Sequence, residues 1–216
     1  MLSTGRAGTS FLYSFFQKYY PEFSITHQTR WSRLINIIGN LPFWNRGNIN
    51  FLHYLYSFLK KKTTLKTTLD PLLAFSICKL ICNDRIKEDV KVVHLTRDPR
   101  DFVTSFMNWK RQSFSKFILH YLIPFWQPYP KGCNISFVRW IFIPKFEKYC
   151  WVWYYKNSLF WQLSKQTNYH HIRIEDLTKS ADKAYHINKL IRFLNLEENG
   201  IDYNTFASSP IKKKKK

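Results

Sequence analysis

Apolar and polar residues alternate along the chain in two periods, one typical of strands and one typical of helices. Residues 90–96 are β-branched and almost continuously apolar, as expected of a short parallel strand that is covered on both faces. Residues 169–174 are predicted as another strand, and Phe23–Thr26 alternates as a short strand does. Strands separated by helices are typical of layered folds. We therefore predict an α/β fold with three layers, in which helices flank a mostly parallel central sheet.

Helices are predicted where apolar residues recur every three to four positions between residues that begin or end helices. The predicted helices cover residues 9–20, 30–38, 70–82, 99–109, 144–166 and 180–194. Asp70-Pro71 opens the third of these as N-cap and first helical residue, and Ser180 caps the last. Residues 45–68 are basic and aromatic and carry no clear pattern. The apolar stripe of the helix over 144–166 runs through Phe146, Tyr149, Trp153, Phe160 and Leu163.

The length and the aromatic content indicate a single folded domain. The chain has 216 residues with 19 Phe, 13 Tyr and 8 Trp, which is enough for a sizeable core. We predict one domain over residues 1–207 and a mobile basic tail over 208–216, which ends in Lys212–Lys216. The strand expected ahead of the first loop is reduced to residues 1–3, which leaves open a start further upstream.

The formal charge of +20 predicts an anionic partner. Candidates are a nucleotide, an acidic glycan, nucleic acid and the surface of an anionic membrane. No signal peptide precedes the first loop and no apolar run reaches the length of a membrane span. We therefore expect a cytoplasmic protein that can contact a membrane surface, with an upstream membrane anchor as the open alternative. Cys78 and Cys82 have no second pair of ligands nearby, so no metal site is predicted.

The most informative stretch is the loop Ser3-Thr4-Gly5-Arg6-Ala7-Gly8-Thr9-Ser10, which precedes an apolar run. Its two glycines allow a tight turn with no Cβ to obstruct an anion. Thr9 or Ser10 can cap the following helix, whose first N–H groups and positive dipole end attract negative charge. Arg6 adds a permanent charge, so we predict a phosphate site. No Lys precedes Thr9, which disfavours an ATPase or GTPase and its Mg²⁺ site.

A second candidate anion site follows the strand predicted over 90–96. Arg97 stands at the strand's end, and Ser105 lies eight residues later in the helix that Pro99 begins. Ligands of α/β sheets bind beyond the carboxyl ends of the strands, which is where both the first loop and Arg97 are expected. A guanidinium and a hydroxyl that face one crevice can hold a phosphate.

The two segments together resemble the sulfotransferases that use 3′-phosphoadenosine 5′-phosphosulfate. In that family a loop like Thr4–Ser10 binds the 5′-phosphosulfate, and a segment like Val92–Ser105 binds the 3′-phosphate through its Arg and its Ser. Residues Tyr169–Leu177 are similar to the family's late strand and its Glu-Asp-Leu ending. The resemblance implies a P-loop nucleoside-triphosphate-hydrolase-like fold. It also implies transfer of a sulfuryl group from this donor to a hydroxyl or amine, without a metal.

The resemblance also implies the roles of individual residues. Arg6 would act catalytically by steadying the sulfuryl group and the leaving oxygen. The residues implied to bind the donor are Gly5, Arg6, Ala7, Gly8, Thr9, Ser10, Arg97 and Ser105.

An acceptor hydroxyl needs a general base, and the segment after the first helix offers His27 and Glu22. We favour His27, which ends the predicted strand over 23–26 and has a suitable ordinary pKa. Glu22 beside Pro21 is interpreted as a solvated loop residue, and the amide of Gln28 cannot act as a base. His94 lies within a buried strand and is interpreted as a core residue.

The acceptor is less well defined by the sequence. From Phe106 to Trp161 the only acidic residue is Glu147, against eight Lys or Arg interleaved with aromatics. This composition suits a small-molecule, glycan or lipid acceptor, and equally an aromatic core with a basic exterior. Two other functions stay open: an inactive or truncated nucleotide-binding relative, and a basic module for nucleic acid or anionic membranes. For a sulfotransferase we expect no nucleic-acid partner, and the oligomeric state is open.

Overall fold

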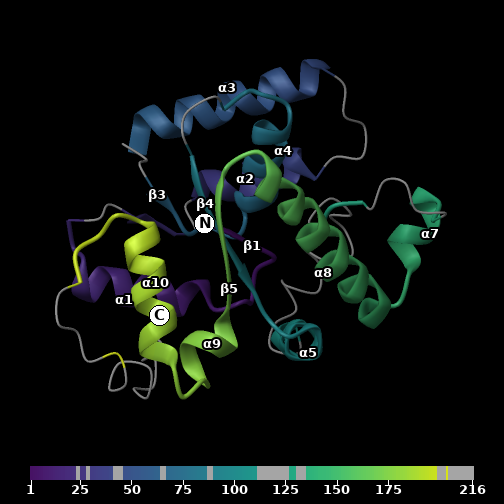
Figure 1. Cartoon of the computed structure of the whole chain (residues 1–216). Coiled ribbons are helices and arrows are strands. Elements are labelled where there is room, and N and C mark those ends of the chain that lie inside the picture. Colours follow the sequence, from purple (N-terminus) through teal and green to yellow (C-terminus); the bar gives the residue numbers. More distant parts are fainter. Residues whose placement is uncertain are drawn as a thin grey trace.

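Figure 1 shows the computed structural model of the chain, in which a small parallel sheet lies between helices. The structure describes residues 1–22, 25–27, 30–40, 46–63, 67–86, 90–110, 127–129, 135–198 and 203. Its strands are β1 (Leu2–Ser3), β2 (Ile25–Thr26), β3 (Thr67–Thr68), β4 (Lys91–Thr96) and β5 (Asn168–Arg173). Its helices are α1 (Thr9–Tyr19), α2 (Arg30–Gly39), α3 (Arg46–Thr63), α4 (Ala74–Cys82), α5 (Pro99–Lys110), α7 (Phe137–Phe142), α8 (Lys145–Gln162), α9 (Ile174–Thr178) and α10 (Lys183–Phe193).

Every strand pair in the described part of the chain is parallel. β4 is the central strand of the order β1-β4-β5, and its His94 pairs with Leu2 on one side and His171 on the other. β2 and β3 form a second parallel pair, and the amino group of Met1 donates to the carbonyl O of Thr68 at 2.6 Å, which brings β3 beside β1. The predicted α/β fold with a parallel sheet is confirmed at this level.

Helices cover both faces of the sheet, as the predicted three layers require. Val93 and Leu95 of β4 point into a core with α1, α9 and α10, whereas Val92 points into a core with α4 and α8, which α2 and α3 extend. The alternation follows from the pleat of a strand, because successive side chains leave opposite faces. The burial of residues 92–95 explains why this strand reads as a continuous apolar run.

Several predicted boundaries are confirmed and others are wrong. The helices predicted to begin at residues 9, 30 and 99 do so. The segment without a clear pattern, 45–68, contains the long helix α3 and the strand β3. Asp70 does not cap α4: its Oδ1 accepts from the amide of Leu72 at 2.9 Å and closes a turn, and the helix begins at Ala74. Ser180 likewise accepts from the amide of Asp182 at 3.1 Å, ahead of α10.

The long helix over 144–166 is also shorter than predicted. α8 ends at Gln162 and a 3₁₀ turn over Leu163–Lys165 follows. Phe146 is 62% exposed, so the buried stripe of α8 begins at Tyr149. Ile174, predicted as the last residue of a strand, is the first residue of α9. The predicted tail over 208–216 lies outside the described residues.

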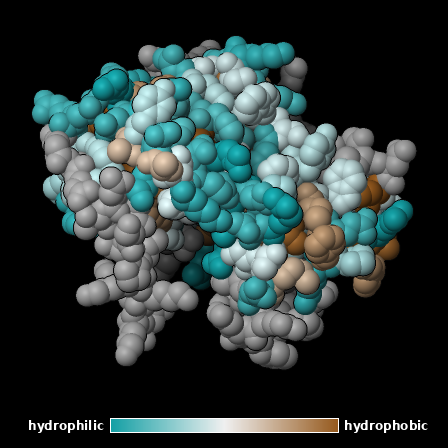
Figure 2. Space-filling view, turned by 60° about the horizontal axis from the view of Figure 1, so that its bottom comes forward, coloured by the Kyte–Doolittle hydropathy of each residue, from teal (hydrophilic) through white to brown (hydrophobic). Residues whose placement is uncertain are grey.

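The described surface seen in Figure 2 is mainly hydrophilic, with an apolar area on the side where α7 lies in Figure 1. Val138 and Phe142 of α7 and Phe146 of α8 are the exposed apolar side chains of this region. Among the described residues, no helix combines the length and the apolar character needed to cross a membrane.

Candidate functional site

The loop between β1 and α1 depends on residues with a left-handed backbone. Gly5, Arg6 and Gly8 have φ values of 82°, 56° and 93°. Gly8 is the N-cap residue of α1 and no side chain caps this helix, so the predicted capping by Thr9 or Ser10 is wrong. A Cβ on Gly8 would lie 2.4 Å from Cδ1 of Ile174. Glycine is therefore required here both by the backbone conformation and by the space available.

The start of α1 presents backbone amides to the loop. The amides of Phe11 and Leu12 donate to the carbonyl O of Gly8 at 3.0 and 3.2 Å. The N–H groups of Thr9 and Ser10 precede them, where an α-helix supplies no acceptor of its own. Thr9 is buried and Ser10 is exposed, so the two predicted hydroxyl donors differ in their access to a ligand. This arrangement suits an anion at the helix N-terminus.

The structure brings together three of the polar side chains that were predicted for the two anion sites. Nε of Arg6 donates to Oγ of Ser105 at 3.0 Å, and Nη1 of Arg97 donates to the carbonyl O of Arg6 at 3.0 Å. Desolvation of the guanidinium, followed by the charge of Arg97, lowers the pKa of Arg6. Two guanidinium groups and a hydroxyl thus converge beside the amides of α1, although Ser105 is 99 residues from Arg6. Such a concentration of positive charge attracts an anion.

Two side chains whose roles the sequence did not reveal bond to the backbone of Arg97 and of the next residue, Asp98. Nε1 of Trp153 on α8 donates to the carbonyl O of Arg97 at 3.0 Å. Oε1 of Glu175 on α9 accepts from the amide of Asp98 at 3.0 Å, which ties the ends of β4 and β5 together. Trp153 was predicted as a core residue. The Glu-Asp-Leu ending of the last strand is the signal that points to Glu175.

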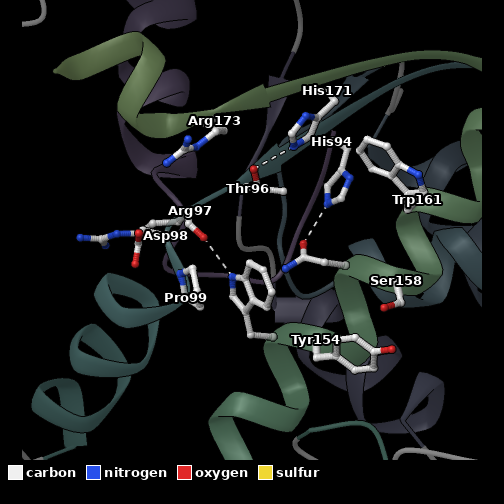
Figure 3. Close-up of a pocket in the computed structure, with 12 residues that line it drawn as sticks. His94, Thr96, Arg97, Asp98, Pro99, Tyr154, Ser158, Trp161, His171 and Arg173 are labelled. Atoms are coloured by element: carbon white, nitrogen blue, oxygen red, sulfur yellow. Dashed lines mark hydrogen bonds between the residues drawn. The ribbon is translucent and has the colours of Figure 1, made fainter. Parts of the chain in front are cut away.

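A cavity of about 580 Å³ lies next to Arg97, between α8 and the carboxyl ends of β4 and β5 (Figure 3). Its walls carry aromatic rings from α8, and two of these, Tyr154 and Trp161, are 61% and 56% exposed. Nδ2 of Asn157, which also lines the cavity, is buried and has no hydrogen-bond partner. Arg97 and Arg173 add positive charge. The cavity therefore suits a ring-shaped ligand with a hydrogen-bond acceptor.

His94 forms part of the same wall as a neutral side chain. Its Nε2 lies 2.8 Å from Oδ1 of Asn157, and its Nδ1 is hydrogen-bonded to the hydroxyl of Tyr169. Burial lowers the pKa of His94 to about 4, and the charge of His171 adds a smaller decrease. The imidazole is 1% exposed, which confirms the prediction that His94 is a core residue. With both ring nitrogens engaged, it orients Asn157 rather than carrying a proton.

His27, the predicted base, directly follows β2. Its ring stacks on Tyr13 of α1, with centroids 5.0 Å apart and planes at 24°. Its Nε2 is buried and has no hydrogen-bond partner in the part of the chain that the structure describes. Burial lowers the pKa of His27, and the charge of Asp70 opposes this shift. Glu22 is exposed in the turn after α1, as predicted, and Gln28 lies outside the described residues.

Comparison with known protein families agrees with the geometry of the loop and of Arg97. In the described part of the chain, no three His, Cys, Asp or Glu side chains gather as metal ligands do. Searches of curated proteins and of solved structures give no significant match. A family model described as a sulfotransferase domain matches residues 1–214, a range that includes both predicted anion-binding segments. The match supports sulfuryl transfer as the class of reaction. The chain thus belongs to the sulfotransferase domain family.

Proposed function

We propose that this protein transfers a sulfuryl group from 3′-phosphoadenosine 5′-phosphosulfate to a hydroxyl or amine of an acceptor. The observation that carries the proposal is the convergence of Arg6, Arg97 and Ser105. The donor has one anionic group at each end of its ribose. The loop over residues 5–10 offers amides and glycines to the 5′ end, and Arg97 with Ser105 offers a guanidinium and a hydroxyl to the 3′-phosphate.

The bound donor supplies the sulfuryl group and a phosphate as leaving group. The residues of the chain supply position and charge, as in phosphoryl transfer. Arg6, which is permanently protonated, stabilises negative charge on the leaving oxygen. Ser105 holds the Arg6 side chain through Nε, and Arg97 holds the Arg6 backbone through its carbonyl O. His27 takes the proton from the acceptor hydroxyl.

The first test is a thermal shift with adenosine 3′,5′-bisphosphate. Ligand at about a hundredfold excess over Kd stabilises the folded state by about 2.7 kcal/mol, which raises Tm by roughly 5–10 °C in a domain of this size. Arg97→Ala should lose most of this shift. Arg192→Ala is the control, because its side chain is 73% exposed and pairs with Glu198. Equal protection by 5′-AMP would overturn the assignment of the 3′-phosphate.

The cavity beside Arg97 supports an acceptor that contains a ring, such as a small molecule or a sugar. A ring stacked on Trp161 would gain about 1 kcal/mol beyond its burial. Trp161→Ala should therefore raise the KM for the acceptor about fivefold to tenfold and leave the affinity for adenosine 3′,5′-bisphosphate unchanged. Trp31→Ala, at an exposed site on α2, is the matched control. A loss of nucleotide affinity in Trp161→Ala would instead assign the cavity to the adenosine.

The charge of +20 supports a second candidate, a basic module that binds nucleic acid or an anionic membrane surface. Such binding falls steeply with salt and does not depend on the 3′-phosphate of the nucleotide. An inactive relative would bind adenosine 3′,5′-bisphosphate but transfer no label. A screen of acceptors with ³⁵S-labelled donor separates these functions from the enzyme.

A further inference from the structure

Asp70 and His27 leave the same edge of the paired strands β2 and β3. Thr26 pairs with Thr68 in parallel register. His27 is one residue beyond this pair and Asp70 is two residues beyond it. Adjacent strands lie about 4.8 Å apart, so the two residues emerge side by side at the carboxyl ends.

Each of the two side chains has a buried polar atom that finds no hydrogen-bond partner among the described residues. These atoms are Nε2 of His27 and Oδ2 of Asp70. Asp70 is 0% exposed, and its other oxygen, Oδ1, accepts from the amide of Leu72 at 2.9 Å. A buried carboxylate is costly unless a cation or a donor compensates it. A protonated imidazole next to it would supply that compensation.

The segment that follows Asp70 lies next to the proposed anion-binding loop. Cβ of Pro71, the residue after Asp70, is 3.7 Å from the position that a Cβ on Gly5 would take. The segment after β3 therefore flanks the loop on one side, while Arg97 and Ser105 approach the loop residue Arg6 from β4 and α5. A proton acceptor beside Gly5 would stand where an acceptor hydroxyl can meet the sulfuryl group.

We propose that Asp70 is a positioning residue for His27, in that its carboxylate orients the imidazole and stabilises the imidazolium formed during transfer. The proposal rests on the proposed function, in which His27 is the base. The acceptor O–H bond breaks and its proton passes to His27, while the acceptor oxygen bonds to sulfur. The bond from sulfur to the 5′-phosphate oxygen breaks, and adenosine 3′,5′-bisphosphate leaves with that electron pair.

The groups that face His27 set its basicity in opposite directions. Tyr13 stacks on the ring from α1 and contributes to its burial, and burial lowers the pKa of His27. Asp70, from the segment after β3, raises it by its negative charge. Removing the charge without changing the shape should therefore make His27 a weaker base.

The decisive experiment follows the His27 ring signals by NMR as a function of pH in the wild type and in Asp70→Asn. Asn keeps an oxygen that can accept from Leu72, so the turn over residues 70–73 is retained. We expect the pKa of His27 to fall, because the negative charge that raises it is removed. Asp182→Asn, at an exposed position ahead of α10, should leave it unchanged. If Asp70→Asn does not fold, Asp70→Ser takes its place, because a hydroxyl can also accept from Leu72.

An unchanged pKa of His27 in either variant would overturn the pairing even in an active enzyme. This NMR measurement needs no donor and no acceptor, so its outcome is independent of the proposed function. In the active enzyme, the acid limb of the kcat/KM profile should move to lower pH by the same amount, with a lower plateau. A shifted pKa together with full turnover of His27→Ala would keep the pair and overturn His27 as the base.

Discussion

Gly8 is a position where a single added methyl group should damage the fold. An Ala at φ 93° carries a backbone cost of about 1–3 kcal/mol. Its Cβ would also lie 2.4 Å from Cδ1 and 2.5 Å from Cγ1 of Ile174, an overlap that costs a further 1–3 kcal/mol or so. We expect Gly8→Ala to lower the free energy of unfolding by about 2–6 kcal/mol and to abolish the stabilisation by adenosine 3′,5′-bisphosphate.

Gly5→Ala is the matched control for the overlap. Gly5 has a similar φ of 82°, but its nearest neighbour, Cβ of Pro71, would be at an ordinary 3.7 Å. Gly5→Ala should therefore show the backbone cost alone, and urea unfolding of both variants measures the difference. In the double variant Gly8→Ala with Ile174→Ala, the loss should be smaller than the sum of the single losses. Equal stabilities of Gly8→Ala and Gly5→Ala would refute the role assigned to Ile174.

Three further predictions concern titratable groups with shifted pKa values. Lys156 is 3% exposed and burial lowers its pKa from 10.5 to about 8, so Lys156→Met should gain about 3 kcal/mol of stability at pH 7. Between pH 8 and 10.5 the unfolded state binds more protons than the folded state, so the free energy of unfolding of the wild type should rise towards that of the variant as pH rises. Stability curves that stay parallel over this range would contradict this. The pKa of His94 is lowered from 6.5 to about 4, so the unfolded state takes up a proton first as pH falls. The free energy of unfolding of the wild type should therefore decrease by about 3 kcal/mol between pH 6.5 and 4, and acid unfolding of His94→Gln should not show this loss. A hydrogen bond from Cys78 lowers the pKa of the Cys82 thiol to about 7, whereas burial raises that of Cys150, so iodoacetamide should label Cys82 at lower pH than Cys150.

The sequence predicted those features that local chemistry and parallel topology determine. The continuous apolar run of β4 indicates a buried strand, and the proline at residue 99 indicates the start of a helix. Parallel strands bring their carboxyl ends to one edge of the sheet. For this reason Arg6, Arg97 and Ser105 were expected at one site before any contact was known. The implied donor contacts of the loop and the role of His27 stay predictions.

Other features depend on distant contacts or on ambiguous local signals. An Asp before a Pro can begin a helix or a turn, and only the contact with the Leu72 amide shows that Asp70 closes a turn. The long helix α3 exposes Phe51, Tyr54 and Phe58, so its aromatic residues do not mark a buried face. Trp153 reaches Arg97 across 56 residues, a contact that no local pattern contains.

One guanidinium links the two predicted anion-binding segments, because Arg97, the proposed partner of the 3′-phosphate, donates to the carbonyl O of Arg6. The charge of Arg97 also acts on Arg6, so the two arginines repel each other across this contact. A ligand with anionic groups at both ends neutralises both charges and relieves the repulsion. A mononucleotide relieves only part of it. Selectivity for the nucleotide with two anionic groups would then originate in the repulsion between Arg6 and Arg97.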